Sequence, residues 1–113
     1  MPASASWPTR WAGHLREVEP DAVVMFTVAP GGVARQVAGK WRTECDPKFD
    51  RWYQGELEDA FDVLGSTGAR VSVTTVAYFD STIDPDASRR HTDCRNRTIK
   101  RAAKASGVKV LDL

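Results

Sequence analysis

Apolar and polar positions follow two different periods along the chain, and each period predicts a different kind of element. Near the start, Trp11, Leu15 and Val18 recur at the i, i+4, i+7 spacing of one helix face, and Pro20 ends the pattern. A continuous apolar and β-branched run then occupies residues 22–29, which is typical of a strand covered on both faces in a parallel sheet. The pattern therefore begins with a helix and then a strand.

A second helix is predicted after a polar connection. Asp46 is its expected N-cap, and Pro47 stands at the first helical position, where the missing N–H has no partner to lose. Gly65 or Gly68 is expected to end this helix in the left-handed conformation, and Gly107 to end the next one. The expected buried stripe of the second helix consists of Trp52, Leu57, Ala60, Phe61 and Leu64.

Two more strands and a third helix complete the pattern. Residues 70–77 are rich in Val and Thr and predict a strand, while residues 78–91 predict a long polar loop. Thr92 or Asp93 is the expected cap of the third helix, and the last strand is expected at residues 109–113. Alternating helices and strands predict an α/β fold of three layers, with a parallel sheet between helices on both faces.

Composition supports one ordinary globular domain over residues 1–113, since 42% of the residues are hydrophobic and 27% are charged. The net charge of +1 provides no general attraction for nucleic acid or an anionic membrane, so nucleic acid is not an expected partner. No signal peptide or transmembrane segment is expected. Cys45 and Cys94 have no CxxC spacing, and they fit either one disulfide or two thiols.

Several stretches together resemble the SGNH (GDSL-like) hydrolase family. They are PDAVVMFTVAPGG, ELEDAFDVLGSTGARV, VSVTTVAYFD and CRNRTIKRAAKASGVKVLDL. The chain is most similar to the SGNH domains of bacterial membrane O-acyltransferases, over residues 11–113. The resemblance implies a flavodoxin-like sheet of order 2-1-3-4-5, of which this chain matches the third, fourth and fifth strands, the second half of the fold.

The same resemblance implies acyl ester hydrolysis or transfer on cell-envelope glycans by complete relatives, through a serine in a GDS turn and a histidine in a DxxH motif. Neither motif occurs in this sequence. We therefore expect a partial domain, truncated at both ends, that is inactive alone and takes an acylated glycan or ester only when missing segments complete it. The alternative is a non-catalytic module that pairs with a protein partner or second copy through the exposed edge of the strand at residues 22–29. The family implies an extracytoplasmic or membrane-associated location.

Four residues are candidates for an oxyanion site or pocket. Pro30-Gly31-Gly32 ends the first strand before the connection at residues 33–43, and the backbone N–H groups of Gly31 and Gly32 can bind an oxyanion or simply form a tight turn. Tyr78 and Asp80 follow the next strand at its carboxyl end, the usual ligand edge, where they can line a pocket or cover the core. No cofactor and no metal are expected.

Other clusters have less specific patterns. Ser81 and His91, with Asp80 or Asp84, can be arranged as a catalytic cluster, although a polar loop collects such residues by composition alone. His91, Asp93 and Cys94 match no zinc spacing and fit a solvated helix start better. Basic side chains make the third helix a solvated face or an anion-binding one: Arg95, Arg97, Lys100, Arg101 and Lys104. Aromatic packing, rather than a sugar platform, is expected at Trp11, Trp41, Trp52 and Tyr53.

Overall fold

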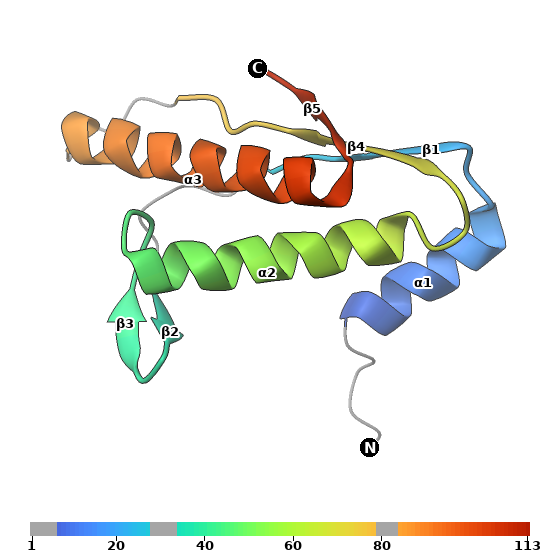
Figure 1. Cartoon of the computed structure of the whole chain (residues 1–113), viewed down its shortest axis with the longest axis horizontal. Coiled ribbons are helices and arrows are strands. Elements are labelled where there is room, and N and C mark those ends of the chain that lie inside the picture. Colours follow the sequence, from blue (N-terminus) through green and yellow to red (C-terminus); the bar gives the residue numbers. More distant parts are fainter. Residues whose placement is uncertain (1–6, 28–33, 79–83) are drawn as a thin grey trace.

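The computed structural model describes residues 7–27, 34–78 and 84–113, which form a three-stranded parallel sheet, three helices and a separate two-stranded hairpin (Figure 1). In chain order the elements are α1 (Trp7–Val18), β1 (Ala22–Met25), β2 (Arg35–Val37), β3 (Lys40–Arg42), α2 (Pro47–Leu64), β4 (Arg70–Thr74), α3 (Pro85–Ser106) and β5 (Lys109–Leu111). The alternation of helix and strand predicted for the sheet is confirmed, and so is the α/β class. No helix in the described ranges is long and apolar enough to cross a membrane.

The sheet has the strand order β1-β4-β5, and both neighbouring pairs are parallel. Met25 is opposite Val73, which in turn is opposite Val110, so these side chains share one face of the sheet. That face is covered by α2 and α3, and Val73 and Ile99 are fully buried between the layers. Alternate residues of β1, such as Val24, point the other way.

The prediction of three layers is wrong for the described part of the chain, which has two. Figure 1 shows the helices on one side of the sheet. The reason is the direction of winding: β1, β4 and β5 follow one another in the same direction across the sheet, and right-handed crossovers then place α2 and α3 on the same face. On the opposite face, Val24 is 45% exposed and Phe26 is 65% exposed.

The stripe predicted for α2 is correct at four of its positions and wrong at Trp52, which is 37% exposed. Phe49 is buried instead, and Tyr53, four residues before the buried Leu57, packs against the core. The stripe therefore passes through position 53, one residue further along the helix than predicted. On α1, Leu15 is buried as the spacing suggests, whereas Val18, the last helical residue, is 73% exposed.

Both long helices begin at an Asp-Pro pair. The carboxylate of Asp46 accepts a hydrogen bond from the Lys48 N–H at 2.8 Å, which confirms the predicted cap of α2. Asp84 caps α3 in the same way, with Pro85 as the first helical residue. The prediction that α3 begins at residue 92 or 93 is therefore wrong, because the Asp84-Pro85 signal repeats that of α2 inside a stretch dominated by polar residues.

Glycine ends the helices differently. Gly107 closes α3 with a φ of +68°, as predicted. Gly65 follows α2 with a φ of −91°, and the left-handed residue is Gly68, at +89°. Position 107 therefore favours glycine on backbone grounds, and position 65 does not.

The predicted polar connection contains the hairpin of β2 and β3. Ala38 and Gly39 both have positive φ in the turn, as a two-residue hairpin loop requires. Val37 is buried, but Trp41 is 70% exposed. The prediction that Trp41 serves as core or crossover packing is therefore wrong.

Two valines on neighbouring strands test the two-layer arrangement. Val73→Ala removes methyl groups from a site with no exposure and is expected to lower the free energy of unfolding by about 2–3 kcal/mol. Val24→Ala, on the open face, is expected to change it by less than about 1 kcal/mol. Urea denaturation measures both, and equal losses would contradict the arrangement.

Candidate functional site at the carboxyl edge of the sheet

The carboxyl end of β4 is held to both neighbouring chain segments by threonines. On the β1 side, the Thr27 hydroxyl donates to the Thr74 carbonyl at 2.7 Å, and the Thr27 N–H donates to the Thr74 hydroxyl at 3.2 Å. On the β5 side, the Thr75 N–H donates to the Leu111 carbonyl at 3.1 Å, and the Leu113 N–H donates to the Thr75 hydroxyl at 2.9 Å. Two consecutive threonines therefore extend the sheet beyond its regular ladder.

The residue after the threonine pair, Val76, is held by a side chain of α3. The side-chain oxygen of Asn96 accepts from the Val76 N–H at 2.7 Å, and its nitrogen donates to the Val76 carbonyl at 2.9 Å. The amide satisfies both backbone groups of Val76, which lies beyond the last residue of β4. This arrangement determines where the chain leaves the sheet toward Tyr78.

A pocket of about 300 Å³ lies at this edge, between the ends of β4 and β5 and the middle of α3. Its polar groups include Tyr78, Asp93, Lys100 and Asp112. The Tyr78 hydroxyl donates to the Asp93 carboxylate, and the Arg89 guanidinium lies 5.3 Å from the centre of the Tyr78 ring. The hydrogen bond to Asp93 is the main cause that raises the pKa of Tyr78 above its ordinary value.

The charges in this pocket can orient a polar ligand, but the described lining contains no serine, cysteine or histidine to act as a nucleophile with its base. Lys100 and Asp112 form an ion pair at 3.4 Å, and both side chains are more than half exposed. Such a pair contributes little to stability. A larger depression, of about 670 Å³, lies at the opposite edge beside Arg70 and Lys109, where the strands begin. Ligands of open α/β sheets bind at the carboxyl edge, so the smaller pocket is the candidate site.

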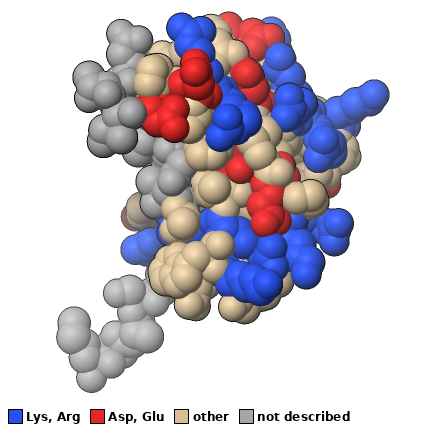
Figure 2. Space-filling view, turned by 90° about the vertical axis from the view of Figure 1, so that its left-hand side faces the viewer, with Lys and Arg blue, Asp and Glu red and all other residues tan. Residues whose placement is uncertain are grey.

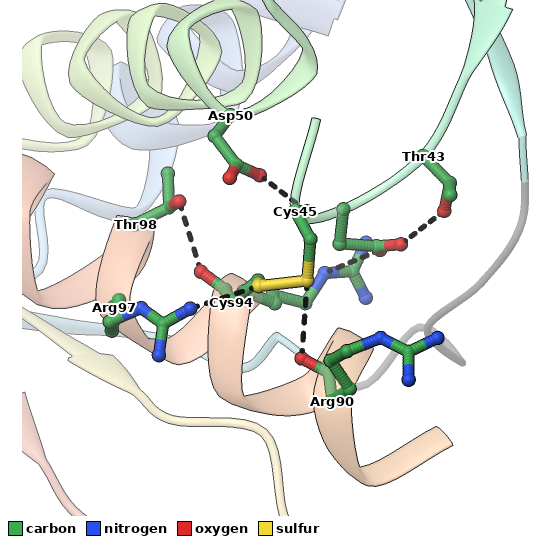
Figure 3. The surroundings of a disulfide bond; sticks show 9 residues. Thr43, Cys45, Asp50, Arg90, Cys94, Arg97 and Thr98 are labelled. Carbon is green, nitrogen blue, oxygen red and sulfur yellow. Dashed lines mark hydrogen bonds and ion pairs between the residues drawn. A yellow bond between two sulfur atoms is a disulfide. The ribbon is translucent and has the colours of Figure 1, made fainter. Parts of the chain in front are cut away.

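Two neighbouring cross-links join the segment before α2 to α3 (Figure 3). Cys45 and Cys94 form a disulfide with Cα atoms 5.3 Å apart, which decides the alternative that their spacing leaves open. Beside it, the buried Glu44 accepts from the Thr43 hydroxyl at 2.6 Å and pairs with Arg95 at 3.5 Å. A buried acid is stabilised only while its cationic partner is present, so Glu44 depends on Arg95.

Arg95 also stacks on an aromatic ring of α2. Its guanidinium lies 5.1 Å from the centre of the Tyr53 ring, within the range of a cation–π interaction. Burial raises the pKa of Tyr53 above its ordinary value. Tyr53 therefore has the packing role predicted for it.

Of the predicted pocket residues, only Tyr78 is in the described part of the chain, where it lines the carboxyl-edge pocket. Gly31, Gly32 and Asp80 lie outside the described residues. Ser81 does as well, so the structure leaves the proposed serine cluster without a described nucleophile.

Asp84 and Cys94, two further members of the predicted clusters, have structural partners. Asp84 accepts from the Ala87 N–H at 3.0 Å as the helix cap, and His91 lies nearly two turns further along α3. Cys94 is bonded to Cys45 and is not available as a metal ligand. Within the described ranges, no three His, Cys, Asp or Glu side chains are grouped to hold a metal ion.

Sequence reasoning missed Asn96 and the threonine pair. The signals were the consecutive threonines at the end of a valine-rich strand and a single amide within the basic stretch CRNR. Neither signal specifies its partner without the fold. Comparison of the chain with protein families, with curated proteins and with solved structures found no match.

Replacement of Asn96 tests its role at the end of β4. Asn96→Ala leaves both backbone groups of Val76 without their side-chain partner and is expected to lower the free energy of unfolding by about 2–4 kcal/mol. Lys104→Ala, at an exposed position of the same helix, is the control and is expected to have an effect below about 0.5 kcal/mol. Chemical denaturation measures both, and a small loss for Asn96→Ala would refute the role.

The pKa of Tyr78 tests the contact with Asp93. In a Tyr53→Phe background Tyr78 is the remaining tyrosine, so the absorbance of tyrosinate reports it alone. Asp93→Asn removes the carboxylate, and the pKa of Tyr78 is expected to fall toward about 10. Because the folded pKa is raised, this contact stabilises the fold at neutral pH, and the stabilisation is lost as pH rises through that pKa. An unchanged midpoint in Asp93→Asn would exclude the contact.

Proposed function

We propose that this chain forms part of an SGNH-type unit that hydrolyses or transfers acyl esters on cell-envelope glycans, with the serine and the histidine supplied from outside this sequence. The observation that supports the proposal best is the parallel order β1-β4-β5, which corresponds to the third, fourth and fifth strands implied by the resemblance. The pocket at the carboxyl edge is also where such a unit places its substrate.

Two further features support the proposal. The open face of the sheet, with Val24 and Phe26 exposed, is a surface that a further layer of helices would cover in a complete α/β unit. The Cys45–Cys94 disulfide fits the extracytoplasmic location implied by the resemblance, because disulfides persist in oxidising compartments. In this function the chain contributes the floor of the site: Tyr78 and Asp93 would orient the polar part of the substrate.

A chimera tests the proposal. Residues 11–113 replace the corresponding segment of a complete SGNH hydrolase, so that the host supplies its GDS serine and DxxH histidine. The chimera is expected to hydrolyse p-nitrophenyl acetate, and changing the host serine to alanine is expected to abolish the activity. The isolated chain is expected to show none above background. A chimera that unfolds cooperatively yet lacks activity would contradict the proposal, as would activity of the isolated chain that Ser81→Ala or His91→Ala removes.

The second candidate is the non-catalytic module that pairs through the sheet edge, and the open edge of β1 favours it. Within the described residues β1 pairs only with β4, so its other side presents unpaired backbone groups next to the exposed Phe26. Val23 and Met25 are on the helix-covered face and are not the residues that a second copy would contact.

Sedimentation over a range of concentrations tests this candidate. The chain is expected to self-associate, and Phe26→Lys is expected to shift it to the monomer because a charge would be buried in the interface. Trp41→Lys is the matched control, since Trp41 is similarly exposed but belongs to β3 of the separate hairpin. A monomer at every concentration, or an equal effect of both variants, would count against pairing through β1.

A further inference from the structure

Three arginines from two helices line another pocket, of about 390 Å³. Arg51 comes from α2, and Arg97 and Arg101 come from α3. Asp50 and Gln54 of α2 complete the polar lining. Figure 2 shows that Lys and Arg side chains crowd one flank of the end of the molecule where α2 and α3 begin.

The charge of this pocket is not balanced. Three guanidinium groups face one carboxylate, and within the described ranges none of the three arginines has an acidic partner within 4.0 Å. Arg42 and Arg95, in contrast, pair with Asp46 and Glu44. Arginines brought together with only one carboxylate repel one another, and an anion bound among them relieves that repulsion.

Both walls of the pocket are attached to the disulfide. The Arg97 guanidinium donates to the Cys94 sulfur at 3.0 Å, and the Asp50 carboxylate accepts from the Cys45 N–H at 3.3 Å (Figure 3). Because Cys45 and Cys94 are bonded, the start of α2 and the middle of α3 keep a fixed separation. The two helices that carry the arginines therefore do not have to be brought together when a ligand arrives, which reduces the entropy lost on binding.

We propose that this pocket binds a doubly charged phosphate group, either as inorganic phosphate or as a phosphate monoester. Guanidinium groups donate two parallel hydrogen bonds to phosphate oxygens, and three of them with one carboxylate leave an excess of two positive charges to match a dianion. The Gln54 amide can supply a further neutral donor. The proposal does not rest on the acyl-transfer proposal, although Arg97 also lines the carboxyl-edge pocket.

Asp50 provides a specific test of the proposal. Its carboxylate is the only acidic side chain in the described lining, and it opposes an anion. Asp50→Asn keeps an oxygen that can accept from the Cys45 N–H and removes the negative charge. The variant is therefore expected to bind phosphate more tightly than the parent chain, a gain that damage to the fold cannot produce.

The test is a titration of the isotope-labelled, disulfide-bonded chain with inorganic phosphate and, separately, with glucose 6-phosphate, at about 0.1 M ionic strength. NMR signals of the arginine side chains report binding. Saturable shifts are expected for Arg51, Arg97 and Arg101, with at least about tenfold weaker binding in Arg97→Gln/Arg101→Gln. Arg10→Gln/Arg35→Gln removes the same charge from exposed sites on α1 and β2, and is expected to weaken binding less than about twofold.

Each outcome of this titration either supports phosphate binding at the pocket or overturns it. Tighter binding by at least about threefold in Asp50→Asn, together with the loss in the arginine pair, supports the site. Shifts that do not saturate, equal losses in the two arginine pairs, or weaker binding in Asp50→Asn would overturn it. Binding of glucose 6-phosphate but not inorganic phosphate assigns the site to a phosphorylated sugar, and the reverse assigns it to the free ion.

Discussion

The direction in which the sheet is wound determines most of the molecule. Since β1, β4 and β5 follow one another across the sheet without a reversal, right-handed crossovers bring α2 and α3 to one face. That face has a continuous core around Val73 and Ile99. The other face keeps Val24 and Phe26 in contact with solvent, and β1 keeps an open edge among the described residues. Both functions proposed for the chain depend on what covers this face and this edge.

The site at the carboxyl edge is held by polar contacts rather than by the core. Thr74 and Thr75 attach the end of β4 to the chain on either side, and Asn96 attaches Val76 to α3. The disulfide joins the residue before the N-cap of α2 to α3, so the carboxyl edge of the sheet and α2 are both attached to α3. The Arg97 side chain, which donates to the Cys94 sulfur, also lines the pocket that contains Arg51 and Arg101. Local hydrogen bonds of this kind keep an edge in place where the regular ladder has ended.

Local signals predicted the elements well and their arrangement less well. The Asp46-Pro47 cap, the glycine at position 107 and the parallel valine-rich strands are properties of short stretches, and sequence reasoning found them. The second face of the sheet depends on whether the strand order reverses, which alternation alone does not encode. The partners of Asn96 and of the cysteines depend on distances between segments that are far apart in the sequence. The exposure of Trp41 was not predicted because each strand of its hairpin has only three residues, too few to show a periodic pattern of apolar positions.

The proposed acyl-transfer function requires a serine and a histidine from segments outside this sequence. The measurement that tests it most directly is the sequence of the genomic DNA on both sides of the coding region, translated in all frames. We expect a GDS-containing segment upstream and a DxxH-containing segment downstream. The absence of both would contradict the acyl-transfer function and leave the edge of β1 as the place where a partner binds.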